Sequence, residues 1–246
     1  MARIAIMKAD ARTERLTELL RLDGVEAALF SETETTQAAA YGDVIVLPLT
    51  AMGTEMFNGL LDREQHLVSG QDFLQRDDFS VLNAIPTVEG AIQVAINNTT
   101  RTIHASRCCV IGFGRIGKLL AERLCAFGAY VSVAARKAGD IAWIRARGYT
   151  AINSMRLEAR LCDEDIIFNT VPHMMLTYAR LTELKKGCLL VDLASAPGGI
   201  DFKAAERLGI NAKWALSLPG KVAPESAAGY LRDTLMTILR EREIMI

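Results

Sequence analysis

The chain has 246 residues, of which 50% are hydrophobic and 23% are charged, and its formal net charge at neutral pH is −1. This length is enough for one large or two small globular domains. The balanced charge gives no electrostatic footprint for nucleic acid or for an anionic membrane surface. The five cysteines include no Cys-x-x-Cys pair, so we expect free, buried thiols and no metal site.

The first residues run directly into an apolar strand pattern at Ile4–Met7. No signal-peptide pattern precedes this strand, and no apolar run approaches the roughly 18 residues of a membrane-spanning helix. We therefore expect a cytoplasmic protein that does not enter a membrane.

Residues 1–85 alternate between strand and helix patterns, which predicts a first, small α/β domain. The expected elements are strands at 4–7, 25–30, 43–48 and 66–70, a helix at 12–22, and a further candidate strand at 79–83. The near-continuous apolar run at 43–48 is typical of a strand buried on both faces of a parallel sheet. No glycine follows the first strand, so we expect this domain to bind substrate and not a dinucleotide.

Residues 86–98 predict a helix that Pro86 opens, since proline is tolerated in a first helical turn. Val88, Ile92 and Ile96 recur at a spacing of four on one face of this helix. We expect residues 86–100 to form a bridge between the first domain and the next.

A glycine motif follows a short apolar run at 108–111 and precedes a helical pattern. It reads Gly112, Phe113, Gly114, Arg115, Ile116, Gly117, which is the spacing Gly-x-Gly-x-x-Gly. The first glycine permits a tight turn, the second lets the backbone approach a pyrophosphate, and the third lets the helix pack on the strand. The N–H groups and dipole of the helix start attract phosphates. The motif predicts dinucleotide binding; the alternative is a glycine-rich turn without a ligand.

Strand and helix patterns alternate again between residues 107 and 214. Strands are expected at 108–111, 130–134, 149–152, 165–169, 188–193 and 211–214. Six strands with crossover helices predict a doubly wound parallel sheet, the Rossmann fold, with strand order 3-2-1-4-5-6. We place this domain at residues 101–223 and expect a helix within 224–246 that packs back toward the first domain. The predicted fold class is thus α/β, a Rossmann domain with a smaller N-terminal α/β domain.

The carboxyl ends of parallel strands share one edge of such a sheet, where ligands bind. An NAD site usually has an acidic residue at the end of the second strand, but this position holds Arg136 followed by Lys137. Two cations suit a 2′-phosphate, so we predict NADP in preference to NAD; the alternative is a pair of solvated charges. The other cofactor-binding residues expected at this edge are Thr170, Val171, Pro172, Ala194 and Ser195.

Three residues near this edge are candidates for catalysis. His173 follows the strand at 165–169 and would act as a base when neutral; the alternative is a histidine in the first turn of a helix. Ser195 favours a hydrogen-bonding role, because no Gly-x-Ser-x-Gly elbow surrounds it. Lys221 would bind a substrate carboxylate, with a solvated lysine as the alternative. Thr50, after the buried strand at 43–48, would offer a hydroxyl from the first domain.

Six segments, taken in order, resemble the dipicolinate synthase A-chain family. They are PTVEGA at 86–91, TIH at 102–104, GFGR at 112–115, NTVP at 169–172, DLAS at 192–195 with PGG at 197–199, and LPGKVAP at 218–224. The resemblance is close from residue 83 to 230 and looser before that. Residues 7–12 match only part of a Gly-Gly-Asp-x-Arg pattern.

The resemblance implies a specific role. Members of the family make dipicolinic acid in the mother cell of sporulating bacteria, where the A-chain works with a second, flavoprotein-like subunit, the B-chain of dipicolinate synthase. Together the two oxidise a dihydro- or hydroxytetrahydrodipicolinate, so the implied partner is this second subunit, and the implied substrate is a small dicarboxylate. The implied architecture is the two-domain arrangement of formate and glycerate dehydrogenases, and we expect a homo-oligomer. Candidate ligands for the two carboxylates are Thr50, Thr87, Arg115, Ser195 and Lys221.

Two alternatives remain open. The 2-hydroxyacid dehydrogenases also carry a GFGRIG turn, but they use an arginine after the fifth strand and a late histidine. Here the fifth strand continues without an arginine, and no histidine follows His173, which disfavours hydroxyacid oxidation. The scarcity of acid and base residues also keeps open a non-catalytic protein that binds NADP(H) as a sensor or scaffold.

Overall fold

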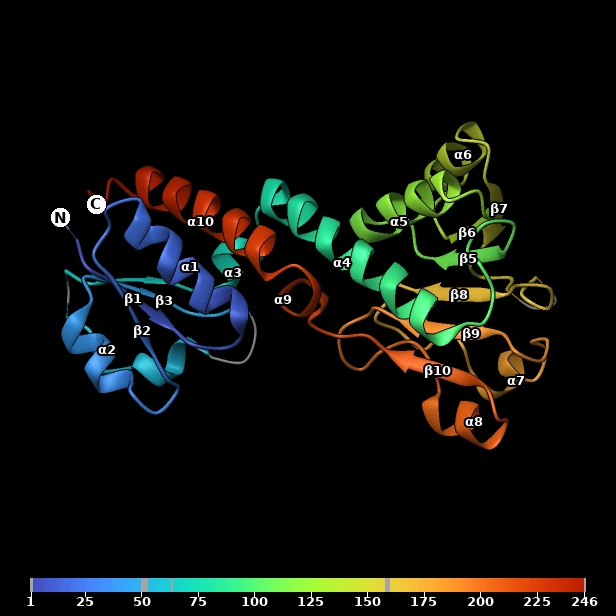
Figure 1. Ribbon diagram of the computed structural model, residues 1–246, viewed down its shortest axis with the longest axis horizontal. Helices are drawn as coiled ribbons and strands as arrows, with labels where there is room; N and C mark the ends of the chain where they lie inside the picture. The colour runs from blue at the N-terminus through green and yellow to red at the C-terminus, as the bar shows by residue number, and fades with distance from the viewer. Residues whose placement is uncertain (1, 50–52, 63, 158–159, 246) are drawn as a thin grey trace. The chain divides into compact units, whose positions relative to one another are not determined.

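The protein is described by a computed structural model that covers residues 2–49, 53–62, 64–157 and 160–245. The chain divides into two compact units. Unit 1 comprises Met1–Pro86 and Pro219–Ile246, and unit 2 comprises Thr87–Leu218. The chain therefore leaves unit 1, builds unit 2 and returns to unit 1 for its last helix (Figure 1).

Unit 2 contains a parallel sheet with the strand order β10-β9-β8-β5-β6-β7 (Figure 1). The strands are β5 (Arg107–Ile111), β6 (Tyr130–Ala135), β7 (Thr150–Asn153), β8 (Ile166–Asn169), β9 (Leu189–Asp192) and β10 (Asn211–Trp214). This is the doubly wound order that the sequence predicts, and the α/β fold class is confirmed. The order reverses between β5 and β8, so this pair marks the point where a ligand is expected.

Alternate residues of the central strands feed separate cores on the two faces of this sheet. Cys108 and Val110 of β5 point into one core, and Cys109 and Ile111 point into the other. The helices of unit 2 that follow the glycine motif are α5 (Arg115–Ala126), α6 (Ala138–Ala146), α7 (Tyr178–Leu181) and α8 (Phe202–Arg207). α5 and α6 supply residues to the first core, and α7 and α8 supply residues to the second.

The connection between β7 and β8 differs from the prediction of a helix in each crossover. Its described residues, 154–157 and 160–165, form turns and no helix. β7 and β8 are separated in the sheet by β6 and β5, so a short connection has to cover this distance. Extended chain spans about 3.3 Å per residue against 1.5 Å for a helix, which favours the irregular path.

Unit 1 contains a second parallel sheet with the strand order β2-β1-β3-β4. The strands are β1 (Ile4–Met7), β2 (Ala27–Phe30), β3 (Val44–Val46) and β4 (His66–Val68), and the helices before unit 2 are α1 (Ala11–Leu22), α2 (Thr35–Tyr41), the 3-10 helix η1 (Thr54–Phe57) and α3 (Gly70–Leu74). Ile4 and Ile6 pack with α1 on one face, whereas Ala5 and Met7 pack with α2 on the other. Both faces of β1 are fully buried, as in other parallel sheets.

The end of the chain completes unit 1. After the short helix α9 (Leu218–Val222), helix α10 (Pro224–Glu241) buries Ala228, Leu231, Leu235 and Ile238, the four residues expected to face inward. These side chains share a core with residues of β1 and α1. Arg15 of α1 also pairs with Glu225 of α10 at 2.5 Å. The hydrophobic core of unit 1 therefore depends on segments from both ends of the sequence.

Helix α4 (Asp77–Asn98) corrects two expectations. It begins at Asp77 and not at Pro86, and residues 79–83 belong to it and do not form a strand. Phe79 packs on Phe73 with 5.6 Å between ring centroids, and this burial outweighs the hydrogen bond that Pro86 cannot donate inside the helix. The expected inner face holds for Val88 and Ile92, but Ile96 is 51% exposed.

By length and composition, α4 passes as a helix that could cross a membrane, but helices in the core of a soluble protein pass the same test. Val88, Ala91 and Ala95 are buried in the first core of unit 2. This burial accounts for their apolar character, so α4 is weak evidence for a membrane span.

The five cysteines are free, but they are not all buried. Cys108, Cys109 and Cys188 are buried, Cys162 is half-buried and Cys125 is exposed. Burial raises the pKa of the Cys108 and Cys188 thiols to about 12, so these two thiols are protonated and unreactive at neutral pH. The expectation of buried thiols is therefore wrong for Cys125, which lies in the last turn of α5.

Candidate cofactor site

The glycine motif joins β5 to α5 at the carboxyl edge of the unit 2 sheet. Gly112 has a φ of +106°, and a Cβ there would lie 2.2 Å from the hydroxyl oxygen of Thr170. A Cβ on Gly117 would lie 2.1 Å from the carbonyl oxygen of Gly112. The first and third glycines are therefore required for α5 to begin this close to the strand.

Gly114 has a different environment. It is the N-cap of α5, no side chain caps this helix, and a Cβ on Gly114 would meet nothing within 4 Å. The first N–H groups of a helix have no partner within the helix, so the start of α5 offers donors beside open space. This cradle fits the pyrophosphate of a dinucleotide.

The loop that follows β8 closes one side of this turn. The backbone N–H and the hydroxyl of Thr170 both donate to the carbonyl oxygen of Ile111, at 2.9 and 3.0 Å. A Cβ on Gly112 would also approach Val171 Cγ2 to 3.1 Å. The structure thus brings the glycine motif together with Thr170 and Val171, which were assigned to the same site from the sequence.

Two buried polar side chains, Asn169 and Asp192, lie at the ends of neighbouring strands at this edge. Asn169 ends β8, Asp192 ends β9, and both are fully buried. They are partners in the strand register, and Asn169 Nδ2 donates to Asp192 Oδ1 at 2.8 Å. Asp192 also accepts from the backbone N–H groups of Ala194 at 3.1 Å and Gly199 at 2.7 Å. Asn169 donates to the carbonyl of Val171, so the pair fixes the loops that follow both strands.

Sequence reasoning did not assign a role to Asn169 or Asp192. A signal was present, because each is a single polar residue at the end of an apolar strand, and the two strands are neighbours in the predicted order. A buried polar group needs a partner, so two such positions at one edge predict each other.

Arg136 and Lys137 follow the last residue of β6, as expected. Both side chains are exposed, and neither takes part in an ion pair among the described residues. Lys137 is the N-cap of α6. The two cations are therefore open to an anionic ligand beside this edge.

The remaining residues assigned to this edge differ in exposure. Ala194 is buried, and its carbonyl accepts from Trp214 Nε1 at 2.9 Å. Ser195 and His173 are exposed. The backbone N–H of His173 donates to the carbonyl of Val171 at 2.8 Å, which turns the chain sharply after Pro172. His173 is not part of a helix, so the alternative of a first-turn histidine is wrong.

The candidate substrate residues do not all belong to unit 2. Lys221 is an exposed residue of α9 and lies in unit 1, whereas Thr87 is the first residue of unit 2, within α4. Thr50 lies outside the described residues. The roles of these residues in substrate binding therefore stay predictions.

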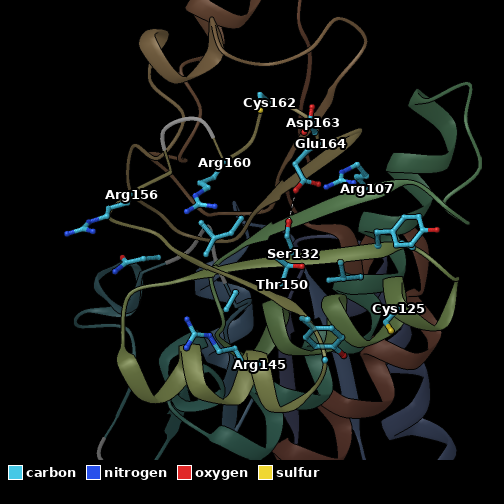
Figure 2. Close-up of a pocket in the computed structure, with 18 residues that line it drawn as sticks. Arg107, Cys125, Ser132, Arg145, Thr150, Arg156, Arg160, Cys162, Asp163 and Glu164 are labelled. Carbon is cyan, nitrogen blue, oxygen red and sulfur yellow. Dashed lines mark hydrogen bonds between the residues drawn. The ribbon is translucent and has the colours of Figure 1, made fainter.

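Unit 2 also contains a cavity of about 670 Å³ that is not the cofactor site (Figure 2). It is lined by residues of β6 and β7 and of the β7–β8 connection, and by no residue of the glycine motif. Glu164 lines this cavity and accepts from the hydroxyl of Ser132 at 2.7 Å, while its other oxygen has no partner among the described residues. Burial raises the pKa of Glu164, against the opposing effect of the Ser132 hydrogen bond.

Comparison with known proteins agrees with this geometry. Residues 85–200 match the model of the D-isomer specific 2-hydroxyacid dehydrogenase NAD binding domain. The A-chain of dipicolinate synthase from Bacillus subtilis (strain 168) is 36% identical over 225 residues, which cover 89% of this chain and 74% of the relative. The chain belongs to the dipicolinate synthase A-chain family.

Solved structures support the same assignment. The dipicolinate synthase A-chain from Bacillus halodurans superposes with a TM-score of 0.83 at 26% identity, over 96% of this chain and 97% of that one. A putative D-3-phosphoglycerate dehydrogenase from Ralstonia solanacearum has a TM-score of 0.67 at 15% identity, over 100% and 96% of the two chains, and shares the fold alone. This member of the family therefore has a dehydrogenase-type domain for a nicotinamide dinucleotide, with the two-domain α/β fold predicted from the sequence.

Proposed function

We propose that this chain is the NADP-dependent oxidoreductase component of a dipicolinate synthase. The observation that carries the proposal is the uncapped, glycine-lined start of α5 in a member of this family. The reaction is the oxidation of dihydrodipicolinate, or of its hydroxytetrahydro precursor after loss of water, to the aromatic dicarboxylate. This oxidation removes one hydride and one proton from the ring.

Residues of unit 2 would hold the cofactor. The backbone at Gly112, Gly114 and Gly117 suits the pyrophosphate, and the exposed pair Arg136 and Lys137 suits a 2′-phosphate. The cofactor-side loops at 170–172 and 194–195 would orient its nicotinamide end. When bound, this cofactor supplies the hydride acceptor, and the protein supplies binding and orientation.

The chain's own side chains would handle the proton and the two carboxylates. His173 is exposed beside the 170–172 loop and would take the ring proton. The Ser195 hydroxyl would hydrogen-bond to the substrate. The charges of Arg115 and Lys221 and the hydroxyls of Thr50 and Thr87 would bind the carboxylates.

We further propose that the enzyme works in the cytoplasm of the mother cell of a sporulating bacterium, as a homo-oligomer together with the flavoprotein-like second subunit of the synthase. Support for this partner comes from the Bacillus subtilis relative, whose name makes it one of the subunits of a dipicolinate synthase. The scarcity of acid and base residues near the glycine motif also suits a reaction that is shared between two proteins.

The test supplies 4-hydroxytetrahydrodipicolinate with NADP⁺ or NAD⁺ to this chain, with and without the second subunit. Nicotinamide reduction and pyridine absorbance are followed together. We expect both signals to rise in parallel with NADP⁺, and no reduction with D-lactate or D-glycerate as substrate. If the second subunit formed dipicolinate by itself at an undiminished rate, this would overturn the redox role and leave the present chain as a binding protein.

A further inference from the structure

The unit 1 sheet has a topological switch point of its own. β1 lies between β2 and β3 in the sheet. Helix α1 connects β1 to β2, and the chain then crosses to β3 on the opposite side of β1. In open parallel sheets, ligands bind outside the carboxyl ends of the strands at such a point. The residues placed there are those of the short turn between β1 and α1 and of the first turn of α1.

Arg12 occupies the first turn of α1 and is held in one orientation. Its side chain is only 10% exposed. Its Nε donates to both carboxylate oxygens of Asp10, at 3.1 and 3.0 Å, and its Nη2 donates to Oδ2 at 2.6 Å. The remaining nitrogen, Nη1, has no bond to a described residue, yet it is not among the buried polar atoms that lack a partner. Nη1 therefore keeps some contact with solvent.

The carboxylate of Asp10 holds the Arg12 guanidinium in place. It also caps α1 by accepting from the backbone N–H of Arg12 at 2.9 Å. Burial alone would raise the pKa of Asp10, but the hydrogen bonds and charge of Arg12 outweigh this and lower the pKa. Asp10 is therefore ionised at neutral pH, and Arg12 is oriented before any ligand arrives.

The start of α9, which belongs to the same unit, lies directly against Asp10 and Arg12. A Cβ on Gly220 would lie 2.8 Å from Asp10 Oδ2 and 3.0 Å from Arg12 Nε. The next residue, Lys221, is exposed and has no ion pair among the described residues. The nearby Lys8 is already paired with Glu14 at 2.7 Å. Asp10 and Glu14 thus balance Arg12 and Lys8, and the ammonium of Lys221 is left over as a positive charge.

We propose that Arg12 and Lys221 form a carboxylate-binding subsite of unit 1 that takes one of the two carboxylates of the substrate. The inference rests on the proposed function for the identity of the ligand, but the geometry belongs to unit 1 alone. An oriented guanidinium with one open nitrogen and an unpaired ammonium suit a single carboxylate.

The test measures binding of dipicolinate and of pyridine-2-carboxylate, which has one carboxylate fewer, to the full chain by calorimetry. The variants are Arg12→Gln, Arg12→Lys and the surface change Lys221→Gln, with exposed Arg240→Gln of α10 as the matched control. We expect Arg12→Gln and Lys221→Gln each to weaken dipicolinate binding by about tenfold or more, because each removes a charge-assisted contact. Arg12→Lys should fall between them and the wild type.

The monocarboxylate separates a binding role from a structural one. If the subsite takes one carboxylate, the wild type prefers dipicolinate and both Gln variants lose most of this preference. Equal weakening for both ligands, no effect of either variant, or no binding of dipicolinate to the wild type would each overturn the inference. Binding of NADPH, measured by fluorescence, should stay within about twofold in every variant, since each change lies in unit 1.

Two outcomes separate the Arg12 subsite from the oxidoreductase activity. Turnover with NADP⁺ that shows the same KM in the wild type and in Lys221→Gln would refute the subsite and keep the oxidoreductase. Dipicolinate binding that depends on Arg12, in a chain that reduces no NADP⁺ with or without the second subunit, would keep the subsite and refute the oxidoreductase.

Discussion

The two units contain the same local arrangement, a buried parallel strand followed by a turn and a helix, but the two helix starts have opposite chemistry. In unit 2, the N-cap of α5 is Gly114 and no side chain caps the helix. In unit 1, the N-cap of α1 is Asp10, and its carboxylate together with Thr13 forms a capping box. One helix start is left for a ligand phosphate and the other is already occupied by the protein's own anion. A helix start becomes an anion site only where the chain does not supply the anion itself.

The largest effect is expected from filling the space that the unit 2 turn leaves out. Gly117→Ala would place a methyl group 2.1 Å from the carbonyl oxygen of Gly112, so the turn has to shift. We expect a loss of stability of about 1–3 kcal/mol in urea denaturation and loss of NADPH binding. Gly139→Ala in α6 is the control, because a Cβ there meets nothing within 4 Å. Retention of cofactor affinity in Gly117→Ala would show that the close approach is not needed.

Exchanging the chemistry of the two helix starts tests the comparison directly. Gly114→Asp gives α5 the kind of cap that α1 has, at a position where a side chain has room. We expect NADPH to bind at least about tenfold more weakly through charge repulsion. Stability should be unchanged or raised by a few tenths of a kcal/mol, since aspartate is only slightly better than glycine as an N-cap.

Gly114→Asn is the neutral match for this experiment, because it caps the helix without a charge. It should lose less NADPH affinity than Gly114→Asp in fluorescence titrations. If both variants bind NADPH as the wild type does, the start of α5 does not hold the pyrophosphate.

A smaller and more selective effect is expected at the end of β6. Arg136→Gln removes a guanidinium that suits the 2′-phosphate, which NAD lacks. Affinity for NADP⁺ should fall by about tenfold while affinity for NAD⁺ stays the same, as measured by calorimetry. Arg123→Gln, an exposed change in the last turn of α5, should alter neither affinity. An equal loss for both nucleotides would contradict the assignment of NADP.

The smallest effect concerns the buried carboxyl in the cavity of unit 2. Because burial raises the pKa of Glu164, its contribution to stability is present below the unfolded pKa and is lost as pH rises through the folded pKa. Glu164→Gln should therefore gain stability relative to the wild type as pH rises above about 4.3, by on the order of 1 kcal/mol near neutral pH. Urea denaturation at several pH values measures this, with exposed Glu206→Gln as the control. A constant difference across this range would contradict the raised pKa.

The sequence predicted unit 2 better than unit 1, and the reason is physical. The strands of unit 2 are apolar runs separated by turn residues, and the positions of Gly112 and Gly117 admit no side chain, so local sequence determines the local structure. The start of α4 could not be predicted in this way. Residues 79–83 read as a strand by composition, but they are helical in the structure, where Phe79 packs on Phe73 in a tertiary contact.

The contact between Arg12 and the start of α9 could not be predicted from the sequence either. Asp10 is close to Arg12 in the chain, but Gly220 reaches the pair only because the chain returns to unit 1 after unit 2 is complete. The pairing of Asn169 with Asp192 was easier to predict than the contacts of Arg12. A crossover separates the two residues in the chain, but the predicted strand order places their strands side by side.

The contribution of α10 to unit 1 determines the order in which the cores of the two units can be completed during synthesis. Ala228 and Leu235 are fully buried in the core that also contains Ile4 and Leu16, so the apolar side of the first strand and helix lacks part of its cover until α10 has been synthesised. All of unit 2 is synthesised before that moment and can fold as a unit by itself. A nascent chain that stalls before residue 224 therefore contains the whole sequence of unit 2 together with a unit 1 whose core is incomplete.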